Sequence, residues 1–161
     1  MYEPSLDEMS FGQWVRYRRR ALGLTQTEVA ARAGMAQSNL AAIEANRRGA
    51  GATTVARLRS VLSARPGDLL ERNRAALLKA ARDHGISNVR VFGSVARGED
   101  HPGDSDIDLL VELPEDGSVT AYLAFAEEAA RILTVPVDVV VDRGGRADEV
   151  LVGARSQAAV L

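Results

Sequence analysis

Charge is divided unevenly along this chain of 161 residues. Residues 1–66 contain 10 arginines and five acidic residues, a formal charge of +5. Residues 67–161 contain 10 basic and 17 acidic residues, a formal charge of −7, so the net charge of −2 conceals a basic half and an acidic half. A contrast of this size predicts two small domains with different partners, although chance segregation of solvated charge is an alternative.

Helix signals follow one another through the basic half. Ser10 is placed to cap a helix that runs to about Leu22, and Thr25-Gln26-Thr27-Glu28 forms a capping box for a second helix. Later helices are predicted over residues 37–45, 53–62 and 68–84, the last capped by Asp68. Because the glycine turn at residues 33–35 joins two short helices, the pattern is typical of a helix-turn-helix.

The segments around that turn carry a family resemblance. Residues 10–70 resemble the Cro/repressor-type (XRE family) helix-turn-helix, through Leu24–Ala30, Ala33-Gly34, Gln37–Leu40 and Ile43-Glu44. In such motifs the second helix enters the major groove with its first residues on base edges. The candidate base-reading residues are Gln37, Ser38 and Asn39, because Gln and Asn can pair bidentately with adenine.

The other expected DNA contacts lie around this helix. We expect Gln26 near the DNA backbone and Arg47 and Arg48 beside phosphates. The arginines at positions 16 and 18–20 spread around one helix, so most of them are expected on the solvated surface. Ala41 and Ala42 leave few side chains to read bases, so a dimer on a two-fold double-stranded DNA operator is expected.

Strand and helix signals alternate in the acidic half. Strands are predicted over residues 89–92, 106–113, 135–142 and 159–161, and longer helices over 119–133 and 147–156. We therefore expect two domains. Residues 1–67 would form an all-α, five-helix helix-turn-helix domain, and residues 68–161 an α/β (α+β) domain with a small mixed sheet.

Three carboxylates stand out in the predicted strands. Asp106 and Asp108 are two residues apart, so on a strand both point to one face, and Asp138 interrupts a run of valines. Adjacent carboxylates repel each other unless a cation lies between them, and Mg²⁺ prefers oxygen ligands. If the two strands are neighbours, all three carboxylates converge. Gly93-Ser94, at a strand-to-helix turn, would allow a phosphate to approach backbone N–H groups.

These features also carry a resemblance. Gly93–Gly98, Ser105–Val111 and Val137–Val140 resemble, over about residues 72–161, the minimal nucleotidyltransferases of the DNA polymerase β superfamily. The resemblance implies that Gly93 and Ser94 bind the triphosphate of ATP and that Asp106, Asp108 and Asp138 are the catalytic residues of a two-metal Mg²⁺ site. Asp106 and Asp108 would bind Mg²⁺, and Asp138 would bind the second metal or act as base for the incoming hydroxyl. Arg97 would lie near the phosphates or bind the acidic loop, and Ser105 would orient the Asp pair.

The combination leaves more than one function open. Minimal nucleotidyltransferases of this type resemble antitoxins that transfer AMP to a HEPN-type toxin, and the helix-turn-helix would let such a chain repress its own operon as a homodimer or hetero-oligomer. Alternatively, the chain is a transcription factor with a silent nucleotidyltransferase domain that senses nucleotide or mediates dimerisation or partner binding. A small-molecule-modifying enzyme fits less well. The absence of cysteine, signal peptide and membrane-spanning segment favours the cytoplasm and no membrane partner.

Overall fold

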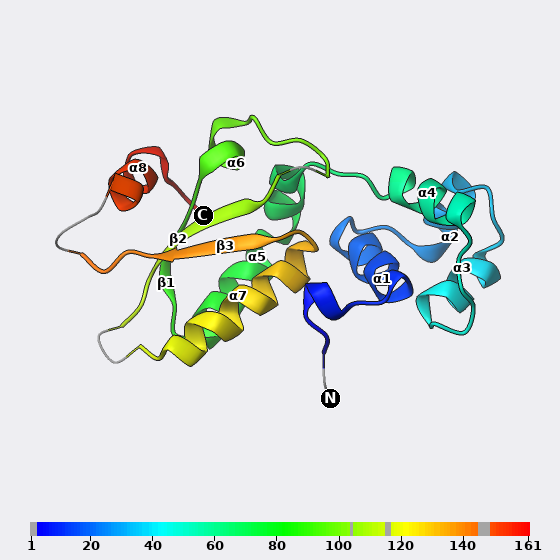
Figure 1. The fold of residues 1–161 in the computed structure, drawn as a ribbon, viewed down its shortest axis with the longest axis horizontal. Helices are drawn as coiled ribbons and strands as arrows, with labels where there is room; N and C mark the ends of the chain where they lie inside the picture. Colours follow the sequence, from blue (N-terminus) through cyan, green and yellow to red (C-terminus); the bar gives the residue numbers. More distant parts are fainter. Residues whose placement is uncertain (1–2, 104, 115–116, 145–148) are drawn as a thin grey trace.

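The computed structural model describes residues 3–103, 105–114, 117–144 and 149–161 (Figure 1). The helices are η1 (Leu6–Glu8), α1 (Phe11–Ala21), α2 (Gln26–Arg32), α3 (Gln37–Glu44), α4 (Ala52–Val61), α5 (Pro66–Asp83), α6 (Gly93–Arg97), α7 (Val119–Leu133) and α8 (Glu149–Gln157). The strands are β1 (Ser87–Phe92), β2 (Ile107–Glu112), β3 (Val137–Val141) and β4 (Ala159–Val160). Within the described ranges, no helix is both long and apolar enough to cross a membrane.

The first four helices form the helix-turn-helix expected from the sequence. The hydroxyl groups of Ser10 and Thr25 accept from the backbone N–H groups of the third residues of α1 and α2, which confirms both predicted caps. Helix α3 starts after Ala36, which offers no side-chain cap. A core formed by apolar side chains of α1–α4 is closed to solvent; its fully buried members are Val15, Val29, Leu40, Leu58 and Leu62.

Helix α5 begins earlier than the sequence suggested. Arg65 occupies the N-cap and Pro66 stands in the first turn, where its missing N–H is tolerated. The prediction that Asp68 caps the helix was therefore wrong, and Asp68 lies inside the first turn instead. The helix passes without a break through residues 67 and 68, the expected domain boundary.

The four strands form a mixed sheet in the order β3-β2-β1-β4. Strand β1 pairs antiparallel with β2 and with β4, whereas β2 and β3 run parallel. Two predicted strand boundaries were too wide. Asp106 precedes β2, and β3 begins at Val137, after Pro136, whose carbonyl oxygen accepts from the N–H of Ile107.

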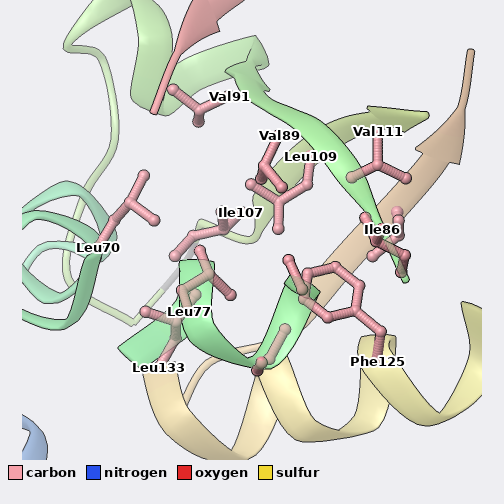
Figure 2. Close-up of a cluster of buried hydrophobic side chains, with 14 of the residues drawn as sticks. Leu70, Leu77, Ile86, Val89, Val91, Ile107, Leu109, Val111, Phe125 and Leu133 are labelled. Atoms are coloured by element: carbon pink, nitrogen blue, oxygen red, sulfur yellow. The ribbon is translucent and has the colours of Figure 1, made fainter. Parts of the chain in front are cut away.

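Helices α5 and α7 cover one face of this sheet (Figures 1 and 2). Ile107, Leu109 and Val111 alternate along β2 and point into the core between the sheet and these helices. Phe125 of α7 and Leu77 of α5 meet them there, and both are fully buried. Because successive side chains on a strand point to opposite faces, Asp108, which lies between Ile107 and Leu109, is directed away from this core.

Direct contacts connect the helix-turn-helix to the sheet domain. Ala21, the last residue of α1, belongs to the core of the sheet domain, and its carbonyl oxygen accepts from the amide of Asn73 in α5 at 2.9 Å. Arg18 donates through Nη2 to the carbonyl oxygen of Thr134 at 2.8 Å. The two units therefore share helix α5 and a packed interface.

Candidate active site and DNA interface

Two of the three expected carboxylates lie on neighbouring strands. Asp108 of β2 and Asp138 of β3 are directly paired in the parallel register. Both therefore project from the face opposite the α5 and α7 core. Asp106 lies two residues before Asp108 and is exposed, as is Asp138, whereas Asp108 is half-buried. The structure thus places the three side chains around the start of β2 and β3.

The electrostatics of this group favour a cation. Burial, together with the negative charges of Asp138 and Asp106, raises the pKa of the Asp108 carboxyl above its usual range. Among the described residues, no three His, Asp or Glu side chains stand close enough together to hold a metal ion on their own. Mg²⁺ is commonly held by one or two carboxylates together with substrate phosphates, so the paired carboxylates suit this ion as donors.

Gly93 brings the backbone against Asp108. It ends β1 and starts α6 with a φ of +69°, in the left-handed region that favours glycine. A Cβ atom at this position would lie 2.1 Å from Oδ2 of Asp108. Only a residue without a side chain therefore fits between β1 and the carboxylate. Ser94 follows in the first turn of α6, so the Gly-Ser turn and the carboxylates face one another.

The hydrogen bonds of Arg97 and Ser105 join them to residues other than the three carboxylates. Arg97 donates through Nε to Glu99 at 2.7 Å and through Nη1 to Gln157 at 2.8 Å. Of the two positions expected for Arg97, the structure has the contact with the acidic loop. The Ser105 hydroxyl accepts from the backbone N–H of His101 at 3.0 Å, and so closes the loop that leads to Asp106.

Asp100 has a structural role that the sequence did not reveal. Its side chain is 1% exposed, and it accepts from Nη2 of Arg65 at 2.7 Å and from the N–H of Gly67 at 2.8 Å. The partners are more than 30 residues apart in the chain, so no local pattern indicates them. This ion pair fixes the loop before Asp106 to the start of α5.

The expected base-reading residues lie at the start of α3. Gln37 and Ser38 are exposed, and Asn39 accepts from Nη1 of Arg48 at 3.0 Å. Arg47 is exposed in the turn after the helix. These positions agree with a recognition helix whose first two residues are exposed and whose following turn carries cations.

A buried network lies behind this surface. Glu44 accepts from Nε and Nη2 of Arg19 at 2.7 and 2.9 Å, and from the amide of Gln26 at 2.8 Å. Gln26 in turn accepts from the amide of Gln37 at 2.7 Å. Gln26, expected near the DNA backbone, thus connects the recognition helix to a buried ion pair. Arg18 and Arg19 are also less solvated than expected, because one contacts Thr134 and the other Glu44.

The fold and the site together define a helix-turn-helix region followed by a nucleotidyltransferase-like α/β domain. Family comparison agrees: residues 15–69 match the Helix-turn-helix model and residues 74–152 match the Nucleotidyltransferase domain model. The chain belongs to the minimal nucleotidyltransferase family and carries an XRE-type helix-turn-helix in front of that domain.

Individual relatives support the assignment. A protein adenylyltransferase, MntA, of Thermococcus cleftensis (strain DSM 27260 / KACC 17922 / CL1) is 32% identical over 87 residues, which span 54% of this chain and 76% of that protein. A solved structure described as a minimal nucleotidyltransferase is 37% identical and superposes with a TM-score of 0.52, covering 59% of this chain and 95% of that one.

Proposed function

We propose that this chain is a DNA-binding autoregulator and an antitoxin-like enzyme that transfers AMP from ATP, with Mg²⁺, to a HEPN-type toxin. The observation that carries the catalytic part is the pairing of Asp108 with Asp138 on parallel strands, with Gly93 packed against Asp108. The similarity to a protein named as a protein adenylyltransferase supports the choice of AMP and of a protein acceptor.

The residues have distinct roles in the proposed reaction. Asp106 and Asp108 would hold Mg²⁺, which supplies charge stabilisation at the α-phosphate and at the leaving oxygen. Gly93 and Ser94 would bind the triphosphate. An acceptor hydroxyl oxygen bonds to the α-phosphorus, the bond from that phosphorus to the bridging oxygen breaks, and pyrophosphate leaves with the electron pair. Asp138, exposed beside Asp108, would receive the hydroxyl proton or help to hold a second ion.

The DNA-binding part rests on the helix-turn-helix. The basic charge of residues 1–66 and the exposed first residues of α3 suit a duplex with its phosphate backbone. A protein that both modifies a partner and binds DNA could report the state of that partner to its own promoter.

The test is label transfer from [α-³²P]ATP to a protein encoded beside this chain, with and without Mg²⁺. Replacing both Asp106 and Asp108 by Asn should abolish transfer, because the two carboxylates would no longer bind the ion. Asp68→Asn, which changes an exposed carboxylate in α5, serves as the control and should leave transfer unchanged. Retained DNA binding in the double variant shows that the chain is folded. If wild-type protein transfers no label to such a partner while it still binds DNA, the silent transcription factor is the better description.

A further inference from the structure

A cleft of about 370 Å³ lies between the helix-turn-helix and the nucleotidyltransferase domain. Its volume is within the range of small-molecule sites, roughly 300–1,000 Å³. One side consists of residues from α1, α4 and the α4–α5 turn, and the other of the segments that precede β2 and β3. The side chains that matter for its chemistry are Trp14, Arg18, Arg59, Ser105, Asp106 and Thr134.

Arg18 is a buried cation with no ion-pair partner in the part of the chain that the structure describes. The residue is 8% exposed, and its only hydrogen bond among the described residues joins Nη2 to the carbonyl oxygen of Thr134. Its Nε atom is buried and has no hydrogen-bond partner, and no described carboxylate lies within ion-pair distance. Burial lowers the pKa of Arg18 to about 10, so the side chain remains protonated at neutral pH. A buried charge in this state favours an anion beside it.

A second arginine points to the same class of ligand. Arg59 of α4 is exposed at the cleft, with its guanidinium 5.2 Å from the ring centroid of Trp14. Arg18 lies 5.4 Å from the same ring. Among the described residues, the lining of the cleft thus contains two guanidinium groups, from Arg18 and Arg59, and one carboxylate, from Asp106. Guanidinium groups match phosphate oxygens in geometry, and an indole provides an apolar wall for the rest of a ligand.

The cleft shares one carboxylate with the candidate active site. Asp106 lines the cleft and stands two residues before Asp108, on whose carboxyl its charge acts. We propose that this cleft binds a phosphate-bearing nucleotide, with Arg18 and Arg59 of the helix-turn-helix as its cationic residues. The choice of a nucleotide rests on the proposed function. In this arrangement, the DNA-binding half supplies part of a nucleotide site.

Trp14 makes the proposal directly measurable. It is the only tryptophan in the chain, so its fluorescence, excited at a wavelength that ATP does not absorb, reports on the cleft alone. Titration with ATP should change this signal in the wild-type protein. Arg59→Gln should weaken ATP binding at least tenfold. Arg16→Gln, which removes an exposed arginine from the opposite surface of α1, should change it less than twofold.

Arg18→Gln should weaken ATP binding at least as much as Arg59→Gln, with circular dichroism as the folding check. If the Arg18 variant does not fold, the Arg59 variant alone decides. Unchanged ATP affinity in Arg59→Gln, or wild-type protein without an ATP-dependent signal, overturns the proposal.

Calorimetry then distinguishes two sources of the nucleotide. One ATP per chain, lost on replacing Asp106 and Asp108 by Asn, identifies the reacting nucleotide. A second ATP per chain that persists in that double variant identifies a separate nucleotide. Either result supports the cleft when Arg59→Gln weakens the binding, and binding that does not depend on Arg59 overturns the proposal. These measurements need no acceptor. Arginine-dependent ATP binding without AMP transfer would therefore overturn the proposed function and leave the cleft assignment standing.

Discussion

Two glycines with the same backbone conformation allow a sharp test of the candidate active site. Gly93 and Gly98, at opposite ends of α6, both have a φ of +69°. Alanine in the left-handed region costs roughly 1–2 kcal/mol, so each Gly→Ala variant should lose at least that much free energy of unfolding, and Gly93→Ala loses in addition whatever the displacement of its neighbour costs. The surroundings differ: a Cβ at Gly98 meets nothing within 4 Å, whereas a Cβ at Gly93 lies 2.1 Å from Oδ2 of Asp108.

The difference in surroundings sets the expected difference in activity. To reach an ordinary contact of 3.4 Å, the Asp108 carboxylate must withdraw by about 1.3 Å. A displacement of about 1 Å at a reacting centre can lower a rate by roughly 10²-fold, or about 2.7 kcal/mol in activation free energy. Gly93→Ala should therefore reduce Mg²⁺-dependent AMP transfer by about 10²-fold, and Gly98→Ala by only a few fold.

The assay pairs urea denaturation, followed by circular dichroism, with the rate of label transfer for each variant. Both variants should lose stability, and their losses of activity should differ greatly. If the two variants transfer label at the same rate, Gly93 does not act through Asp108 and the reasoning fails. If Gly93→Ala proves fully active, the carboxylate is not where catalysis needs it.

Other consequences can be measured independently. Two arginine side chains hold the pKa of the Asp142 carboxyl well below its usual range, so its stabilising effect is present above the ordinary Asp pKa near 4 and fades at lower pH. Asp142→Asn should thus lower the free energy of unfolding more at pH 7 than at pH 3, and equal losses would contradict this. Glu44→Ala should cost about 3 kcal/mol in urea denaturation, because it leaves Arg19 without its buried partner; a loss under 1 kcal/mol would argue against the network. Arg47→Ala should weaken binding to every DNA sequence and reduce the salt slope by about one, whereas an unchanged slope removes Arg47 from the phosphate contacts.

Local signals in the sequence predicted most of the architecture. The caps at Ser10 and Thr25 depend on bonds within one helical turn, so a short stretch of sequence contains both partners. The strand and helix signals indicated both strands and the helix between them, but whether the strands are neighbours was left open, and the parallel pairing of β2 with β3 brings Asp108 beside Asp138. Asp106 was placed on a strand because it continues the alternation, yet the backbone pairing begins one residue later.

Contacts between distant segments could not be predicted in the same way. Glu44 is an ordinary helix-surface residue by periodicity, and only the approach of α1 brings Arg19 to it. The same holds for Asp100, which accepts hydrogen bonds from Arg65 and Gly67, both more than 30 residues away in the chain. The burial of Arg18 could not be predicted either, because Arg18 belongs to a run of three arginines whose side chains point to different neighbours. In each case the packing of segments that are distant in the sequence decides which charge is buried.

The shared helix α5 and the bond from Arg18 to Thr134 have a consequence for geometry on DNA. Helix-turn-helix dimers occupy half-sites about 34 Å apart, one turn of the duplex. Because each nucleotidyltransferase domain is packed against the helix-turn-helix of the same chain, two chains bound this way would carry their carboxylates at a separation and rotation dictated by the operator. Inserting about five base pairs, half a turn, between half-sites would place the two nucleotidyltransferase domains on opposite sides of the duplex. The spacing of the operator half-sites would then set the relative position of the two nucleotidyltransferase domains, as well as the place on the DNA where the chains bind.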